Sequence, residues 1–167
     1  YRFKSNCGKR FAHIVGFLKS KSDFIVTIDS DTIIKKDAIT EILKPFNNKK
    51  VAAVAGNIKV ANKNENLLTR CLSARYCTAF GVEKESQSVF GCVTCCSGSF
   101  SAYRQEYLIP LINKYANQKF LGKTCTYGDD RHLTNLLLRK YDIVYNDKAI
   151  AYTFVPNKLK VLVKQQV

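Results

Sequence analysis

The sequence predicts one α/β domain, residues 1–167, with a mostly parallel central sheet and helices on both faces. Short β-branched runs alternate with helical patterns along the chain, which is typical of such sheets. The 167 residues are one domain's length, and 46% are hydrophobic, enough for a buried core. No repeat and no Pro/Gly/Ser-rich linker divides the chain.

The first part of the chain predicts a helix, a strand and a second helix. Residues 10–19 predict a helix because their apolar side chains recur three and four positions apart. Residues 24–28 form a β-branched run bounded by charged residues, which predicts a buried strand. Residues 38–46 predict a helix that ends near Pro45.

The middle of the chain predicts shorter strands and one long helix. Residues 51–54 and 58–60 predict two strands interrupted at Gly56. Residues 67–80 have the spacing of a longer amphipathic helix. Residues 93–96 predict a short strand that ends at a Ser-Gly pair.

The last part predicts two helices, two strands and the start of another helix. Residues 105–115 predict a helix kinked at its proline, and 130–140 a helix with leucines on one face. Strands follow at 143–145 and 150–154, and a helix begins at residue 158. Folds of this kind have their ligand-binding and catalytic residues at the carboxyl ends of the parallel strands. Residues just after strands are therefore the candidates for a site.

The net charge is strongly positive: Lys plus Arg is 27 and Asp plus Glu is 13, so 27 − 13 = +14. Such a field attracts polyanions, including nucleic acid, anionic lipid and phosphorylated small molecules. The basic residues are scattered, which favours a solvated basic surface. Nucleic-acid binding is the alternative, since nine Tyr and ten Phe could stack on bases. No nucleic-acid motif is present, so we expect no such partner.

The seven cysteines predict reduced thiols rather than a disulfide framework, because their number is odd and the chain is not a small secreted scaffold. Cys92 and Cys95 have zinc-ligand spacing, and Cys125 with His132 could complete a set. A second closely spaced pair is absent, so buried, inert cysteines are favoured. Because the chain begins with Tyr1 and contains no Met, we expect a piece of a longer protein.

Two carboxylates directly follow the predicted strand 24–28. Asp29 and Asp31, separated by Ser30, could both approach one divalent cation, and hard oxygen ligands suit Mg²⁺ or Mn²⁺. Such a cation neutralises charge on a leaving diphosphate. The alternative is a turn or a helix cap, which Asp and Ser also favour.

A second acidic pair, Asp129 and Asp130, opens the predicted helix 130–140. A carboxylate there could act as a general base, and the alternative is a helix N-cap favoured by the helix dipole. Lys9 and Arg10, at the start of the first helix, could hold a phosphate. The spacing of a Walker loop is absent around them.

Small residues follow the predicted strand 93–96. Ser97 and Gly98 would let a ligand approach the backbone closely, and a tight turn is the alternative. Cys96 has no partner pattern for a nucleophile, because neither histidine is near it in sequence.

Together these residues resemble the processive family 2 glycosyltransferases, in particular hyaluronan synthases. The chitin and nodulation chitooligosaccharide synthases share several of the same elements. The resemblance covers nearly the whole chain in order, and its long middle block and FLG…GDDRHLTN are specific. The stretches that carry it are NCGKR (6–10), VTIDSDT (26–32), RYCTAFGVEKESQSVFGCVTCCSG (75–98), KFLG (119–122), GDDRHLTN (128–135) and the terminal KQQV.

The resemblance implies a GT-A fold on the cytosolic face of the cell membrane, flanked by transmembrane helices. It implies a UDP-sugar donor, Mg²⁺ or Mn²⁺, and a growing polysaccharide as acceptor. Transfer would be inverting. The donors would be UDP-GlcNAc and UDP-GlcA for a hyaluronan-like product. For a chitin-like product, UDP-GlcNAc would be the single donor.

The resemblance also assigns roles by position. Asp130 resembles the general base, Asp31 the metal-coordinating Asp, and Asp29 with Ser30 lies near the donor. Lys9 and Arg10 match a basic segment near the donor diphosphate. The acceptor side corresponds to four residues, of which the last is expected to orient the base by charge pairing: Ser97, Gly98, Asp129 and Arg131.

The sequence departs from the family pattern at three places. Gln165 and Gln166 begin the family's QxxRW motif, whose Arg and Trp are absent here. The upstream donor-binding strand and the membrane segments are absent too, so we expect this chain to be the middle of a catalytic domain, inactive by itself. Ser99 stands where many relatives have Pro, a difference we expect to be neutral.

Overall fold

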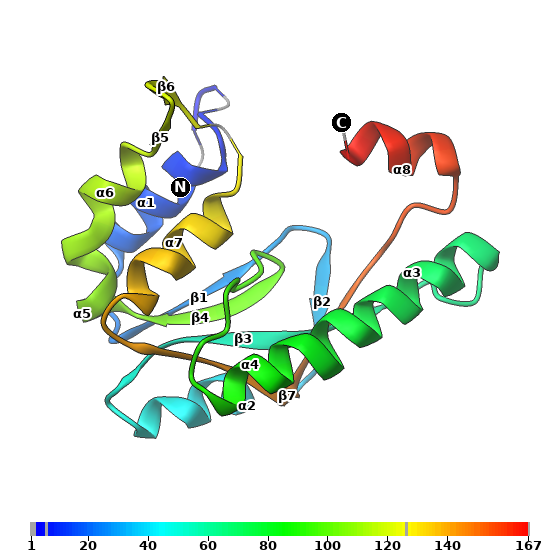
Figure 1. The fold of residues 1–167 in the computed structure, drawn as a ribbon, viewed down its shortest axis with the longest axis horizontal. Coiled ribbons are helices and arrows are strands. Elements are labelled where there is room, and N and C mark those ends of the chain that lie inside the picture. The colour runs from blue at the N-terminus through cyan, green and yellow to red at the C-terminus, as the bar shows by residue number, and fades with distance from the viewer. Residues whose placement is uncertain (1–2, 6, 126, 167) are drawn as a thin grey trace.

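The computed structural model describes residues 3–5, 7–125 and 127–166. Its centre is a five-stranded sheet in the order β1-β4-β3-β7-β2 (Figure 1). A separate two-stranded hairpin precedes the helix α7. The strands are β1 (Phe24–Ile28), β2 (Thr32–Ile34), β3 (Val51–Val60), β4 (Phe100–Arg104), β5 (Lys119–Phe120), β6 (Lys123–Thr124) and β7 (Asp142–Thr153).

The sheet is mixed. β1, β3 and β7 run in one direction, and β3 pairs with β7 in parallel. β4 runs against both of its neighbours, β1 and β3, and β2 runs against β7. The α/β class is therefore confirmed and most strands share a direction, but among the described strands only the β3–β7 ladder is parallel.

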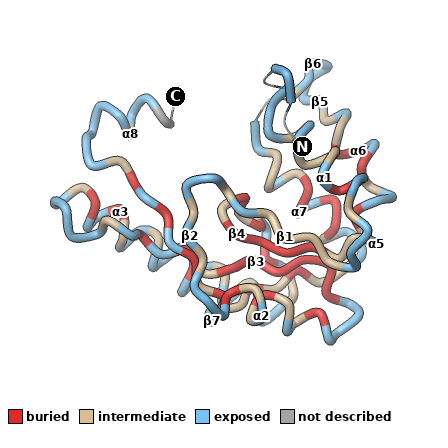
Figure 2. The backbone as a smooth tube through the Cα atoms, turned by 180° about the vertical axis from the view of Figure 1, so that it is seen from behind, coloured by how far each residue is buried: buried red, intermediate tan, exposed pale blue. Residues whose placement is uncertain are grey.

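Helices lie on both sides of the sheet. In Figures 1 and 2, α1, α6 and α7 lie above the sheet and α2 lies below it. The helical segments are α1 (Lys9–Lys19), α2 (Ala38–Leu43), η1 (Lys44–Asn47), α3 (Leu67–Thr78), η2 (Ala79–Lys84), α4 (Glu85–Val89), α5 (Gln105–Leu108), η3 (Ile109–Leu111), α6 (Ile112–Ala116), α7 (Asp129–Leu138) and α8 (Leu159–Gln166).

The core is centred on β3 and β4. Val51–Ala55 and Phe100 are buried, and Leu137 and Ile143 close the core from α7 and β7. Figure 2 shows this burial along β3 and β4, with exposed residues on the outer helices. β1 is an edge strand of the described sheet and only half-buried, which corrects the prediction of a buried strand.

Two predicted breaks are absent. The strands expected at 51–54 and 58–60 are one strand, β3, and those expected at 143–145 and 150–154 are one strand, β7. Their ladder continues past Gly56 with a register shift between Gly56 and Asn57. A β-bulge thus takes up the irregularity that the sequence presents as a break.

One predicted strand is wrong. Residues 93–96 form a loop, with only a bridge between Cys92 and Ile143 next to it, and the strand begins at Phe100. The predicted strand fails because the buried Val93 and Cys96 are placed by a loop that crosses to α7. The helices predicted at 105–115 and 130–140 are confirmed, the first broken at Ile109–Leu111.

α8 lies apart from the sheet, beyond a link after β7 (Figure 1). Its Leu162 packs against a small second cluster of Val60, Leu72 and Val155. Within the described ranges, no helix combines the length and the apolar character that crossing a membrane requires.

Candidate active site

Asp29 follows β1 and is held on both carboxylate oxygens. Its Oδ1 accepts a hydrogen bond from Lys9 Nζ at 2.8 Å, and its Oδ2 accepts one from Ser99 Oγ at 3.2 Å. A proline at position 99 would lack this hydroxyl and its hydrogen bond to Asp29. Ser30 and Asp31 are exposed in the turn between β1 and β2, where Thr32 N donates to Asp29 O at 3.1 Å.

Asp130 lies in the first turn of α7, facing the loop that precedes β4. Its Oδ2 accepts a hydrogen bond from Gly98 N at 2.8 Å and lies 3.8 Å from Lys9 Nζ. The side chains of Lys9 and Asp130 are 41% and 28% exposed, so a substrate can reach both. The cavity beside them, of about 540 Å³, is lined by Lys9, Cys95, Tyr127, Gly128, Asp129, Asp130 and Arg131.

Lys9 joins the two carboxylates. Partial burial opposes its charged form, but the hydrogen bond to Asp29 and the charges of Asp130, Asp29 and Asp129 outweigh burial and raise its pKa. Lys9 therefore carries its positive charge throughout the neutral range. The result is one ammonium between two carboxylates, one in the turn after β1 and one in α7.

The contact between Lys9 and Asp130 leaves no room for a Cβ at Gly98. A Cβ there would lie 2.9 Å from Asp130 Oδ2 and 3.0 Å from Lys9 Cε, and closer still to Lys9 Nζ. The space over Gly98 is filled by the ends of these two charged side chains, so a Cβ there would require them to shift.

Asp129 and Arg10 form a second, less accessible pair. Arg10 Nε donates to Asp129 Oδ1 at 2.8 Å, and Arg10 also donates to Gln118 Oε1 at 2.6 Å. The Arg10 guanidinium lies 5.6 Å from the centre of the Tyr115 ring. The two side chains are only 12% and 13% exposed, so this pair ties α1 to α7 while Lys9 faces the cavity.

Arg131 is exposed and makes no ion pair with Asp130, although both residues are described. The predicted charge pairing between them is therefore wrong, because consecutive residues of a helix point about 100° apart. Lys9, from another element, is the cation beside Asp130. Ser97 belongs to the loop that precedes β4, and its carbonyl oxygen accepts a hydrogen bond from Ser101 Oγ at 2.7 Å.

Thr134 is a site residue that the sequence pattern did not single out. It is fully buried; its Oγ1 accepts from Cys96 N at 2.9 Å and donates to Asp130 O at 2.7 Å. Thr134 lies one helical turn after Asp130, on the same face of α7. This spacing of four residues was the signal in the sequence that could have identified it as a neighbour of Asp130. Burial also raises the pKa of the Cys96 thiol to about 12, which disfavours the thiolate that a nucleophile needs.

The cysteines are mostly accessible. All seven are free thiols, and only Cys96 is buried, which corrects the prediction of buried cysteines. The described residues contain no cluster of three or more His, Cys, Asp or Glu side chains suited to a metal, so Cys92, Cys95, Cys125 and His132 do not assemble a zinc set.

The turn after β1 fits a hard cation of the kind that needs few protein ligands. Asp31 offers exposed carboxylate oxygens, and Asp29 adds a carboxylate two residues away. Mg²⁺ in proteins often binds through one or two carboxylates together with water and substrate phosphates. Gln165 and Gln166 are at the end of α8, and their side chains are not among those that the structure describes.

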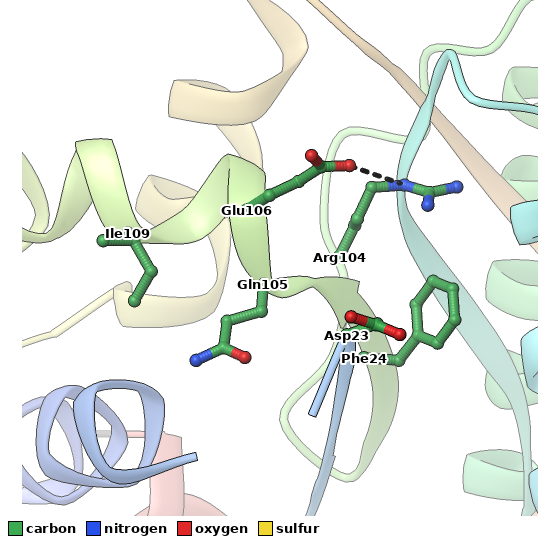
Figure 3. A pocket seen from close by; sticks show the side chains of 6 residues that line it. All are labelled: Asp23, Phe24, Arg104, Gln105, Glu106 and Ile109. Carbon is green, nitrogen blue, oxygen red and sulfur yellow. Dashed lines mark ion pairs between the residues drawn. The ribbon is translucent and has the colours of Figure 1, made fainter. Parts of the chain in front are cut away.

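A further cavity, of about 440 Å³, lies at the opposite end of β1 and β4 (Figure 3). Phe24 pairs with Arg104 there, whereas the site lies at the other ends of these strands. Arg104 donates to Phe46 O at 2.6 Å and lies 3.9 Å from Glu106 Oε1, and its guanidinium covers the Phe24 ring. These contacts make Arg104 a structural cation.

The fold and the site define the class: a GT-A glycosyltransferase domain. Among solved structures, a mannosyltransferase from Pyrobaculum calidifontis in complex with GDP-Man and Mn²⁺ has a TM-score of 0.61 at 17% identity, covering 93% of this chain and 39% of that chain. A glucosyl-3-phosphoglycerate synthase from Mycobacterium tuberculosis, in complex with Mn²⁺ and UDP-Glc, has a TM-score of 0.50 at 17% identity, covering 96% and 52%.

The chain belongs to the chitin synthase family, whose model matches residues 2–167. It is 44% identical over 166 residues to a hyaluronan synthase of Streptococcus pyogenes. It is 37% identical over 162 residues to an N-acetylglucosaminyltransferase of Mesorhizobium japonicum. The chain is covered to 99% and 96% in these matches, but it spans only 40% and 38% of the two relatives. The resemblance to processive family 2 glycosyltransferases is confirmed.

Proposed function

We propose that this chain is the central part of a metal-dependent, inverting, processive glycosyltransferase that extends a hyaluronan-like polysaccharide from UDP-GlcNAc and UDP-GlcA. One observation carries the proposal. The carboxylate of Asp130 lies in an open cavity, held by Gly98 N at 2.8 Å and within 3.8 Å of Lys9 Nζ, which also pairs with Asp29. Such a carboxylate can take a proton while the neighbouring ammonium attracts a diphosphate.

In the proposed mechanism, Asp130 removes a proton from the acceptor hydroxyl. That oxygen then attacks the anomeric carbon from the face opposite UDP, which inverts the configuration. Lys9 contributes positive charge on the diphosphate side. Gly98 N–H keeps the Asp130 carboxylate oriented, since it donates to one of its oxygens.

Asp31, with Asp29, is the proposed site for Mg²⁺ or Mn²⁺. A cation bound there would neutralise charge on the departing diphosphate. Asp31→Ala should weaken metal-dependent UDP binding at least about tenfold, since it removes the freest carboxylate of the turn. Calorimetry with UDP, with and without Mn²⁺, measures this, and Asp147→Ala, at an exposed carboxylate on β7, is the control. Unchanged metal-dependent binding by Asp31→Ala would reject the role.

The remaining proposed roles come from the resemblance to the family. Ser30 belongs to the donor side with Asp29, and Ser97, Gly98, Asp129 and Arg131 to the acceptor side. Arg10, proposed for the donor side, supports that side by holding α1 and with it Lys9 in place, because its own guanidinium is already paired with Asp129.

Location and the final motif are also proposals. Gln165 and Gln166 would begin a QxxRW segment that closes over the site. The parent protein would lie in the cell membrane with this domain on the cytoplasmic side. The +14 charge would then lie beside anionic lipids of the inner leaflet and attract UDP-sugars.

The test of function is sugar incorporation by the full-length protein in membranes, with Mg²⁺ or Mn²⁺. We expect a long polymer from labelled UDP-GlcNAc only when UDP-GlcA is also present. Product from UDP-GlcNAc alone would instead assign a chitin-like or chitooligosaccharide product, which the family match and the rhizobial relative also favour. No incorporation with any donor would contradict the enzymatic proposal.

A further inference from the structure

A π-helical turn lies next to the catalytic loop, defined here as residues 95–99. α3, η2 and α4 follow one another without a break over residues 67–89, and η2 (Ala79–Lys84) is the π-helical part. A π turn holds one more residue than an α turn, so it rotates the side chains that follow by about 100°. π turns are rare and often occur at functional sites. The last residue of this one is Lys84.

The Lys84 ammonium points into the protein rather than into solvent. It donates a hydrogen bond to the carbonyl oxygen of Cys95 and lies 5.1 Å from the centre of the Phe80 ring. Phe80 is buried in the main core, and Lys84 itself is half-buried. Lysine is seldom buried without a partner, and here its partner is the first residue of the catalytic loop.

The catalytic loop leads from Lys84 to Asp130. Cys95 lines the same cavity as Asp130, and the next residue, Cys96, donates its N–H to Thr134 Oγ1 at 2.9 Å. Gly98 N then donates to Asp130 Oδ2 at 2.8 Å. Lys84 therefore fixes the start of the loop, and α7 fixes its middle.

We propose that Lys84 is a positioning residue for the transfer reaction, acting through Cys95 to hold Gly98 N–H against Asp130. The inference rests on the proposed function of Asp130 as general base. Within the described part of the chain, Lys84 makes no ion pair with Asp29 or Asp130. It fixes the position of the loop backbone whose Gly98 N–H bonds to Asp130. A displacement of about 1 Å at a reacting group can cost about a hundredfold in rate.

The test uses Lys84→Met, Lys84→Arg and Lys140→Met in the full-length protein. Lys140 is an exposed lysine just beyond the far end of α7 and serves as the matched control. We expect Lys84→Met to lower kcat by about ten- to a hundredfold with KM for UDP-GlcNAc within about twofold. Lys84→Arg, which keeps a cationic donor, should restore most of the rate.

A second readout does not depend on transfer. Hydrogen exchange at the amides of residues 96–98 should be faster in Lys84→Met than in wild type, and unchanged in Lys140→Met. Exchange and kcat equal to those of Lys140→Met would overturn the proposal. If wild type incorporates no sugar, the proposed function fails, while the exchange comparison still decides whether Lys84 holds the loop. If Lys84→Met does not fold, a Lys84→Arg protein with wild-type exchange and rate supports the inference, and one with a much lower rate overturns it.

Discussion

At the scale of single residues, the site depends on a backbone N–H at a position where a side chain would meet the two charged groups, Lys9 and Asp130. Gly98 N donates to Asp130 at 2.8 Å, in a space already filled by Asp130 Oδ2 and the end of Lys9. The sequence indicated small residues here because Ser97-Gly98 reads as a close-approach loop. It could not indicate which groups approach, because Lys9 and Asp130 are distant from Gly98 along the chain.

Gly98→Ala should therefore reduce transfer by at least about a hundredfold, since the new methyl group would push Lys9 and Asp130 apart. Global stability should change much less, because the displaced groups are partly exposed. Rate and melting temperature measured on the same preparation test this. Gly81→Ala, where a Cβ would meet nothing within 4 Å, is the control. A Gly98→Ala protein with normal rate would show that the close contact does not matter.

Thr134 allows a second residue-scale prediction. Thr134→Val keeps the shape but leaves Cys96 N–H buried without its acceptor, so the free energy of unfolding should fall by about 1–3 kcal/mol. Thr134→Ser keeps the hydroxyl and should lose less than Thr134→Val. Urea unfolding of the three proteins measures the difference. Equal stability of the Val variant and wild type would contradict the hydrogen bond.

At the scale of elements, the first helix is fixed to the acceptor side of the fold. Arg10 ties α1 to α7 through Asp129, and His13 Nδ1 lies 3.2 Å from the hydroxyl of Tyr115 on α6. The position of Lys9 follows from these contacts, because it precedes Arg10 at the start of α1. The sequence predicted α1 itself but not its partners, since those contacts join residues about a hundred positions apart.

His13 makes stability depend on pH. Burial lowers its pKa below the ordinary value of 6.5, more than the nearby carboxylate of Asp130 raises it. The unfolded chain therefore takes up a proton first as pH falls. The free energy of unfolding should decrease as pH drops through about 6.5 and stop decreasing below the lowered pKa of the folded state. Urea unfolding between pH 7.5 and 5 measures the slope.

His13→Gln should flatten this pH dependence, whereas His132→Gln, which removes the other histidine, should leave it in place. The Tyr115 ring stacks on His132 at 6.2 Å, so the control variant tests a neighbour of the same ring. A His13→Gln protein with the full wild-type slope would assign the pH dependence to other groups.

Element prediction failed mainly where tertiary contacts override local pattern. Residues 93–96 have the composition of a strand, yet they form a loop because Cys96 N–H bonds to Thr134 and Lys84 holds Cys95. The sequence did not predict β4, because its polar residues Ser101 and Arg104 interrupt the apolar run expected of a strand buried between β1 and β3. The π turn after α3 has no signal in hydrophobic spacing.

At the scale of the whole molecule, the sequence predicted the α/β class and the motifs that meet at the site. Asp29 and Asp130 lie about a hundred residues apart, and one ammonium, that of Lys9, joins them. The sequence could not predict this joining, nor that Arg10 would be occupied by Asp129. Both contacts depend on how α1 and α7 come together above the sheet. The order of residues along the chain does not contain that information.

The most direct test compares wild type with Asp130→Asn in the full-length protein. Sugar incorporation and UDP binding are measured in parallel with divalent metal present. The account predicts that Asp130→Asn lowers transfer by about 10²–10⁴-fold or more while UDP binding stays within about twofold, because the amide cannot accept the proton but leaves the donor side intact. Normal transfer by Asp130→Asn would contradict the central claim that this carboxylate is the general base.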